Sequence, residues 1–256
     1  SLPKFSSILK KSKKPLFIVG QGALCSVQGE LIYNFCLDTY LKLSKDKSWN
    51  GFNILQTYSG RVGSLDLEFY NEKLIKSKSV IDKIYNGDYE VLFLLGADDL
   101  NFDKIPKKTF VIYQGHHGDK AVSRADLIIP TSCFTEKEGI YVNLEGRPQL
   151  SRQVKLPLPS VDHSWDFFKK TSKFFGSNPE FSNLDDLRSK MFQKYKHLSN
   201  LNEVQSSDLI HPKKCKYNFA EDEIVSNINN FYMTDSVSRN SPTMSTCSLA
   251  FQKKSV

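Results

Sequence analysis

Five short apolar runs, separated by glycine, proline or polar turns, most constrain the fold of this chain. They are LFIV at 16–19, FNILQ at 52–56, VLFLL at 91–95, FVIY at 110–113 and LII at 127–129. Runs this short and continuous are typical of strands buried in a parallel sheet. Helical periodicity follows the first run from about residue 27 and precedes the third near residues 73–85. The pattern predicts an α/β fold, with a parallel, Rossmann-like sheet flanked by helices.

The second half of the chain has a different pattern. Two amphipathic stretches, HSWDFFKKTSKFFG and LDDLRSKMFQKY, predict a helical section after residue 157. From about residue 199 the chain turns polar and has few apolar anchors. We therefore expect a basic arm over 1–14, an α/β domain over 15–157, a helical section over 158–198, and an extended tail over 199–256 that docks on partner subunits.

The composition excludes several classes of protein. The cysteines Cys25, Cys36, Cys133, Cys215 and Cys247 are too scattered for a disulfide framework, a zinc finger or an iron–sulfur cluster held by this chain alone. No apolar run has the length of a membrane span. The net charge of +7 favours acidic partners, but the basic residues are interleaved with acids outside one cluster, KKSKK at 10–14. Nucleic acid is therefore not the expected partner.

Ligands of parallel sheets bind beyond the carboxyl ends of the strands, and three glycine turns are expected at that edge. In the first, Gly20 and Gly22 are followed by Cys25, where a full dinucleotide fingerprint has its third glycine. A structural turn is therefore favoured over phosphate binding. The other two turns are GADD at 96–99 and GHHGD at 115–119. Because His116 and His117 are adjacent, we expect their side chains to diverge, which favours a polar turn over a metal site.

The segment at 125–149 is the richest in polar groups and predicts a loop at the ligand edge of the sheet. Its candidate residues are Glu136, Gly139, Asn143, Glu145, Gly146, Arg147 and Gln149. An arginine with amide and carboxylate neighbours can recognise a phosphorylated or heterocyclic ligand. The alternative is that these groups satisfy one another in a loop network.

These motifs together carry a resemblance. ADLIIP followed by EKEGIYVNLEGRPQ resembles the signature of the molybdopterin oxidoreductases. KKPLFIVGQGAL, LLGADD, YQGHHGD and FYMTDSVSRNSPTM resemble the molybdopterin-oxidoreductase-like C-terminal part of the large iron–sulfur subunit of respiratory complex I, of the mitochondrial type. The resemblance runs from about residue 13 to about residue 247. The cluster-binding N-terminal region of that family is not in this sequence, so a split subunit is expected, with a shortened chain as the alternative.

The resemblance implies a non-redox structural fragment of an enzyme, the proton-pumping NADH:ubiquinone oxidoreductase. It implies no catalytic residue, metal or cofactor in this chain, with iron–sulfur clusters on the partner half of the subunit and FMN elsewhere in the complex. Ile140 stands where the signature usually has threonine, which removes a hydroxyl from the old cofactor loop. The alternatives are an active molybdopterin- or nucleotide-binding oxidoreductase fragment and, on charge alone, a nucleic-acid-binding protein.

The resemblance also implies partners and a location. The partners are other peripheral-arm subunits, chiefly the cluster-binding half of the same subunit. The location is the matrix side of the mitochondrial inner membrane, or alternatively the cytoplasmic face of a bacterial plasma membrane. A relic pocket is expected to stabilise the sheet edge without holding a cofactor. It comprises Gly115, His116, His117, Gly118 and Asp119 together with the polar residues of the 125–149 segment.

Overall fold

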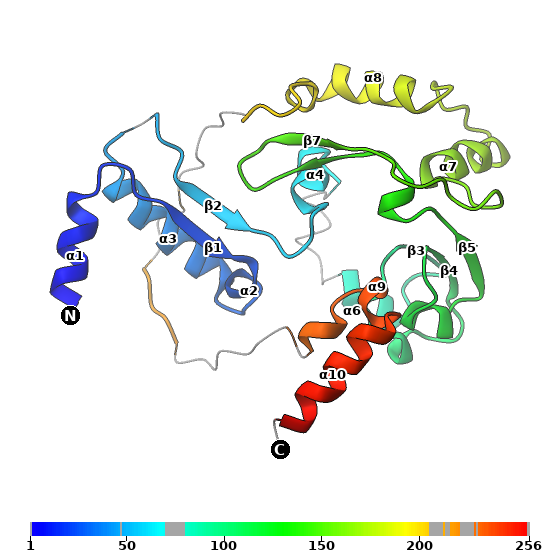
Figure 1. Cartoon of the computed structure of the whole chain (residues 1–256), viewed down its shortest axis with the longest axis horizontal. Coiled ribbons are helices and arrows are strands. Elements are labelled where there is room, and N and C mark those ends of the chain that lie inside the picture. Colours follow the sequence, from blue (N-terminus) through cyan, green and yellow to red (C-terminus); the bar gives the residue numbers. More distant parts are fainter. Residues whose placement is uncertain are drawn as a thin grey trace. The chain divides into compact units, whose positions relative to one another are not determined.

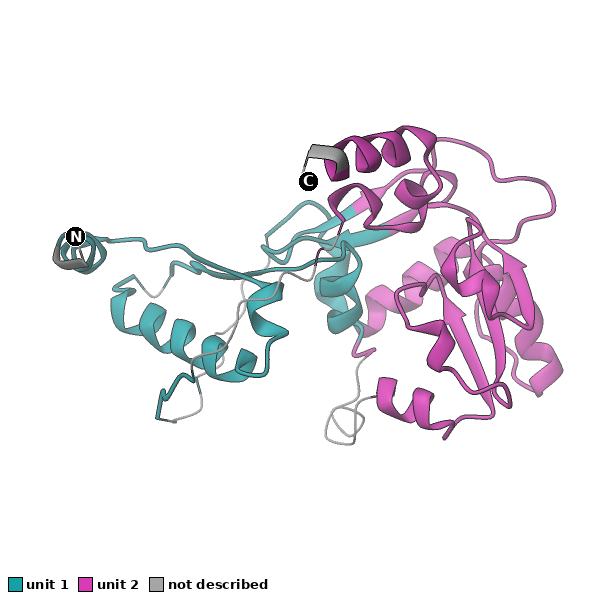
Figure 2. Cartoon of the chain, turned by 90° about the horizontal axis from the view of Figure 1, so that it is seen from below, with its two compact units in different colours: residues 1–67, 140–149, 195–227 teal, residues 68–139, 150–194, 228–256 magenta. Residues whose placement is uncertain are grey.

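The computed structural model describes residues 2–46, 48–69, 80–204, 212, 216–220, 228 and 230–254. The chain separates into two compact units, each assembled from segments that are distant in sequence (Figures 1 and 2). Unit 1 comprises residues 1–67, 140–149 and 195–227, and unit 2 comprises residues 68–139, 150–194 and 228–256. The organisation into an arm, an α/β domain, a helical section and a tail stays a prediction.

Unit 1 is built on a two-stranded parallel sheet. Strand β1 (Phe17–Gly20) pairs with β2 (Phe52–Leu55), and helix α3 (Gly29–Leu43) connects them as a crossover. The helix packs its fully buried Leu37 and Tyr40 into the core of this unit. The Tyr40 hydroxyl donates to the Trp49 carbonyl at 2.6 Å and accepts from the Gly51 N–H at 2.8 Å. Through its hydroxyl group, Tyr40 therefore also positions the chain that leads into β2.

Unit 1 contains four further helical elements within the described residues. They are α1 (Leu2–Lys11), α2 (Gln21–Leu24), α4 (Arg61–Asp66) and the 3₁₀ turn η5 (Lys196–Ser199). The predicted basic arm is thus largely helical. The Tyr195 hydroxyl donates to the Leu67 carbonyl at 3.1 Å, which ties the segment leading into η5 to the end of α4.

Unit 2 is built on a three-stranded parallel sheet in the order β3 (Val91–Leu95), β4 (Phe110–Gly115) and β5 (Leu127–Pro130). Helix α6 (Val80–Asn86) and the 3₁₀ turns η1 (Phe102–Lys104) and η2 (Lys120–Ser123) cover one face. Alternate residues of the strands point to opposite faces, so Leu94, Val111 and Tyr113 enter this core while their neighbours face the other way. The remaining buried core residues are Ile84, Phe102, Ile105 and Ala121.

The two helices expected after residue 157 are confirmed as α7 (Ser164–Ser172), which continues into the 3₁₀ turn η4 (Lys173–Phe175), and α8 (Leu184–Lys194). The five predicted strands are likewise confirmed to within two residues at each end. Of the helix predicted near 73–85, the part from Val80 onward is helical, and residues 70–79 lie outside the described residues.

The prediction that the tail is extended is wrong over its last part. Residues 231–254 form the 3₁₀ turn η6 (Phe231–Met233), α9 (Ser236–Arg239) and α10 (Pro242–Lys254), coloured orange to red in Figure 1. Helix starts here depend on polar caps rather than on apolar anchors. The Asp235 carboxylate accepts from the N–H groups of Val237 and Ser238, at 2.9 and 3.0 Å. Within the described residues, no helix combines the length and the apolar character that crossing a bilayer requires.

Candidate functional site

Two of the glycine turns singled out by the sequence meet at the carboxyl edge of the β3–β4–β5 sheet. The GADD turn leaves β3 through Gly96, whose positive φ of 62° favours glycine. The Gly96 N–H donates to the Gln114 carbonyl of β4 at 2.7 Å, which holds the two turns in register. The turns carry Asp98 and Asp119, so two carboxylates lie at one edge of the sheet. The Gly20–Gly22 turn belongs to the separate β1–β2 sheet of unit 1.

Arg239, at the end of α9, reaches both carboxylates. Its Nη2 lies 2.6 Å from Asp98 Oδ2 and 2.6 Å from Asp119 Oδ2, and its Nε donates to the same Asp119 oxygen at 2.7 Å. Its Nη1 donates to the Met233 carbonyl at 3.4 Å and lies 3.8 Å from Asp99 Oδ1. The stretches GADD, GHHGD and SVSRNS are far apart in sequence, and this one side chain joins them. We call Asp98, Asp119 and Arg239 the Asp–Arg–Asp cluster.

Burial makes the Asp–Arg–Asp cluster strong and sensitive to protonation. Only 9%, 8% and 11% of the Asp98, Asp119 and Arg239 side chains are exposed. Burial raises the pKa of Asp98 to about 6, and its hydrogen bond with Asp119 adds to the rise. At Asp119 burial acts in the same direction, but hydrogen bonds with Arg239 and Asp98 outweigh it and lower the pKa. The two carboxyl groups thus share one guanidinium and differ in proton affinity.

Sequence reasoning missed Arg239 as a site residue, although it lay in a stretch that carried the resemblance. A signal existed, because GADD and GHHGD place three carboxylates at the ends of neighbouring strands. Buried carboxylates require a partner. The distance of 120 residues between Asp119 and Arg239 hid that partner.

The side chains of His116 and His117 were predicted to diverge, but they approach each other. Their Nδ1 atoms approach to 2.6 Å and their rings stand perpendicular, with centroids 4.9 Å apart. Burial lowers the pKa of His116, and the adjacent His117 lowers it further, which favours the neutral form of the His116 ring in this contact. Among the described residues, no group of three or more histidine, cysteine or acidic side chains is arranged to hold a metal ion.

The two glycines of GHHGD differ in their surroundings. A Cβ at Gly115 would overlap the ring of Tyr113, which is 2% exposed, whereas the space around Gly118 is open. Gly115 therefore allows the chain to fold closely over the buried tyrosine. Gly118 has no such packing role.

The segment predicted as a polar loop contains a two-stranded hairpin instead. Strand β6 (Gly139–Val142) and strand β7 (Pro148–Ser151) pair around the turn at 143–147. The apolar run IYV was too short to distinguish from a loop by periodicity. Gly146 has a positive φ of 76°, which this tight turn requires. Gly146 of the signature thus serves backbone geometry.

The polar residues of the hairpin mostly bind one another. Asn143 Oδ1 accepts from the N–H groups of Glu145 and Arg147, at 2.9 and 3.0 Å. The Arg147 side chain donates to the Asn202 carbonyl at 2.5 Å and to Glu145 at 3.4 Å. Farther back, Glu136 Oε2 accepts from the Cys133 N–H at 3.0 Å and caps the short turn η3 (Phe134–Glu136). Of the two alternatives for this segment, the contacts favour mutual satisfaction, among side chains that are half-buried or exposed.

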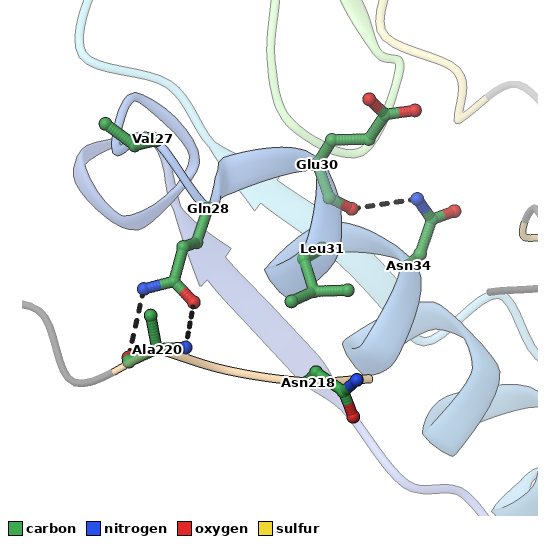
Figure 3. A pocket seen from close by; sticks show the side chains of 7 residues that line it. All are labelled: Val27, Gln28, Glu30, Leu31, Asn34, Asn218 and Ala220. Atoms are coloured by element: carbon green, nitrogen blue, oxygen red, sulfur yellow. Dashed lines mark hydrogen bonds between the residues drawn. The ribbon is translucent and has the colours of Figure 1, made fainter. Parts of the chain in front are cut away.

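Unit 1 has one cavity at the hairpin and another at the start of α3. The first, of about 270 Å³, is lined by Gln149 and Asn143 from the hairpin together with Tyr58 and Tyr141. The second, of about 510 Å³, lies between the start of α3 and the segment at 216–220 (Figure 3). There the Gln28 amide pairs with the backbone of Ala220, donating at 3.1 Å and accepting at 3.0 Å. Tyr217 and Phe219 pack edge-on against Phe35, so the second cavity is bounded by a docked strand-like segment.

The Gly20–Gly22 turn is poorly suited to phosphate. It leads into α2, a single turn of four residues, before the longer α3 begins at Gly29. The Gln21 side chain accepts from the Thr57 N–H at 2.8 Å and links the turn to the end of β2. The turn therefore connects elements of unit 1.

The four cysteines within the described residues are free thiols, and Cys215 lies outside them. A partly buried contact lies near the start of α7, where Ser132 Oγ and His163 Nδ1 are 2.8 Å apart. Ser132 is completely buried, so its hydroxyl is not placed for nucleophilic attack. It anchors the residue that precedes α7.

Comparisons with known proteins agree with this arrangement. Residues 3–174 match the molybdopterin oxidoreductase family, and residues 201–247 match the family of the C-terminal region of the G subunit of NADH-ubiquinone oxidoreductase. The second match includes Arg239, and the first includes Asp98 and Asp119.

Individual relatives carry consistent names. The chain is 35% identical to the G subunit of NADH-quinone oxidoreductase of Rickettsia bellii over 98% of its length. It is 35% identical to the mitochondrial 78 kDa subunit of NADH-ubiquinone oxidoreductase of Candida albicans, over 96% of its length. It is 34% identical to the mitochondrial NADH dehydrogenase [ubiquinone] iron-sulfur protein 1 of Solanum tuberosum, over 97%. It covers 35%, 34% and 33% of these relatives, so it spans about a third of their length.

The resemblance drawn from the sequence motifs is therefore confirmed. The chain belongs to the molybdopterin oxidoreductase family, and it resembles the C-terminal third of the large iron–sulfur subunit of complex I.

Proposed function

We propose that this chain is a structural part of the peripheral arm of respiratory complex I, NADH:ubiquinone oxidoreductase. In this role it supports electron transfer from NADH to ubiquinone, coupled to proton pumping, and carries no redox centre of its own. The observation that carries the proposal is the Asp–Arg–Asp cluster, where three stretches of the family resemblance converge on one buried ion pair. Residues that mark the family at the sheet edge thus hold the tail helices in place.

The residues at the sheet edge do not fit an anionic pterin or nucleotide cofactor. Asp98, Asp99 and Asp119 bring carboxylates to the edge where such a ligand would bind, and Arg239 is already engaged by all three. A phosphate there would meet like charges, and the Arg239 guanidinium is already paired with carboxylates. An absorbance spectrum and a metal analysis of the purified chain test this point, since stoichiometric pterin or molybdenum would contradict it.

The second face of the β3–β4–β5 sheet supports a role within a larger assembly. Parallel sheets are normally covered on both faces. Helix α7 covers only part of this one, and an apolar groove of about 580 Å³ remains beside Phe93, Ile112 and Phe167. Val91 and Leu127 on its rim are 57% and 46% exposed.

A buried amide also lies on this face of the sheet. The Gln114 side chain follows Ile112 by two residues, is 1% exposed, and finds no hydrogen-bond partner for Oε1 or Nε2 within the described residues. An unsatisfied buried amide is costly. A neighbouring polypeptide that covers this face would bury the apolar rim.

The partners in this proposal are peripheral-arm subunits, chiefly the cluster-binding region of the family subunit. Iron–sulfur clusters belong to that region, and FMN lies elsewhere in the complex. The location is the matrix side of the mitochondrial inner membrane, or the cytoplasmic face of a bacterial plasma membrane. Relatives named as mitochondrial and bacterial proteins support both settings.

Native electrophoresis of detergent-solubilised source membranes tests the proposal. The gel is stained for NADH dehydrogenase activity, and the chain is identified in each band by mass spectrometry. We expect it in the large active band together with peptides of the cluster-binding region. If the chain runs only as a small free protein, the assignment to complex I fails.

A further inference from the structure

The N-terminal segment carries positive charge without counter-charge. Lysines occupy positions 4, 10, 11, 13 and 14, and the first acidic residue is Glu30. Within the described residues, Lys14 lies over the Trp49 ring at 5.5 Å, whereas Lys4, Lys10, Lys11 and Lys13 form no ion pair. Much of the net charge of +7 is therefore concentrated at one end of the chain.

Helix α1 carries an apolar face with lysines beside it. Phe5, Ile8 and Leu9 follow the i, i+3, i+4 spacing of one helix face, and Lys4 and Lys11, four residues before Ile8 and three residues after it, flank that face. Phe5 and Ile8 are each 59% exposed. Figure 2 shows α1 at the N-terminal end of unit 1.

A helix of this kind needs a partner. Its ten residues are fewer than the roughly 12–15 at which an isolated helix becomes even marginally stable in water. Stability must come from packing of the apolar face, and that face is largely exposed here. The lysines beside it select a partner with negative charge.

We propose that α1 docks as an amphipathic helix into an apolar groove with an acidic rim on a neighbouring protein subunit. Phe5 and Ile8 anchor the helix in the groove, and Lys4, Lys10 and Lys11 pair with carboxylates around it. The inference rests on the proposed function, which places the chain among other subunits. A protein groove is favoured over a lipid surface because so few apolar side chains, on a helix about 15 Å long, anchor weakly in a bilayer.

The test compares matched variants of the full chain expressed in the source cells. Lys10→Glu/Lys11→Glu reverses two charges of α1, and Lys107→Glu/Lys108→Glu reverses two exposed adjacent lysines elsewhere. Phe5→Ser/Ile8→Ser removes the apolar anchors, and Val27→Ser, at a residue 98% exposed, is its control. The readout is the fraction of the chain in the active band of the native gel. We expect both α1 variants to lower this fraction by about tenfold and both controls to leave it unchanged.

Each result decides a different question. If wild type is missing from the active band, the proposed function itself fails. If wild type is present and the α1 variants match it, only the docking role of α1 is overturned. Binding of the purified chain to vesicles of phosphatidylserine and phosphatidylcholine is measured in parallel. Vesicle binding that Lys10→Glu/Lys11→Glu abolishes, with assembly intact, would reassign α1 to a lipid surface. A photo-crosslink from position 8 to an acid-flanked segment of another subunit would support the proposal directly.

Discussion

Replacement of Arg239 by methionine is the most direct test of the role given to the Asp–Arg–Asp cluster. Methionine keeps most of the length and apolar volume of the side chain but removes every donor. Asp98 and Asp119, 9% and 8% exposed, would then be left facing each other without a cation. Breaking a buried pair by removing one partner costs about 3–5 kcal/mol.

Proton uptake limits that cost. The pKa of Asp98 is already raised to about 6 with Arg239 present, and loss of the cation raises it further. At neutral pH one carboxyl therefore takes up a proton and shares it with the other. We expect the Arg239 replacement to lower the free energy of unfolding by about 3 kcal/mol at neutral pH, the lower end of the range for breaking a buried pair, and by less at pH 5.

Two measurements on the purified chain check this expectation. Urea denaturation at pH 7.5 gives the change in unfolding free energy, and limited proteolysis followed by mass spectrometry gives the exposure of residues 230–254. Lys170→Ala is the control, because Lys170 bridges Asp162 and Asp166 in an exposed position. We expect no measurable change for the control and faster cleavage of α9 and α10 in the methionine variant. A loss below about 1 kcal/mol, the range of exposed pairs, would refute the reasoning.

Three further predictions concern the same features. Because the folded-state pKa of Asp98 is raised, its proton is held more tightly in the folded state, so its contribution to stability is present at low pH and lost as pH rises through about 6. Asp98→Asn should flatten the dependence of the urea midpoint on pH between about 4 and 6, and an unchanged slope would identify another titrating group. Gly115→Ala must displace the buried Tyr113 ring and should lower the free energy of unfolding by about 1–3 kcal/mol. Gly118→Ala lies in open space and should leave the stability nearly unchanged. Equal effects of the two variants in thermal denaturation would contradict the packing argument. Tyr40→Phe removes the acceptor of the Gly51 N–H and should lower the free energy of unfolding by about 1–3 kcal/mol. The Tyr33 hydroxyl makes no hydrogen bond within the described residues, so Tyr33→Phe should leave the stability unchanged in the same assay.

The strands were predictable because their signal is local. The runs at 91–95, 110–113 and 127–129 are apolar at every position, and both faces of a parallel strand are normally buried. The hairpin of β6 and β7 was not predictable from the sequence, because its apolar residues are few and its turn is as polar as a loop. The helices α9 and α10 escaped prediction because caps such as Asp235, rather than apolar periodicity, define where they begin.

The candidate site divides in the same way. Gly96, Asp98, Gly115 and Asp119 could be placed at strand ends from sequence, since carboxyl ends of parallel strands share an edge. The closeness of the His116 and His117 nitrogens and the self-contained bonding of Asn143 depend on backbone torsions that residue types do not reveal. Patterns of residues locate polar groups but not their partners.

Hydrophobic periodicity and turn residues act over a few neighbours, so the sequence alone predicted the α/β class, the five parallel strands and the helices α3, α6, α7 and α8. Its motifs also determined the family, and comparisons with relatives confirmed it. Only the tertiary structure decided which carboxylates are buried and what neutralises them. Arg239 neutralises these carboxylates although it lies 120 residues from Asp119 in the sequence. The energy of an ion pair depends on distance in space and on exclusion of water, and neither is a property of local sequence.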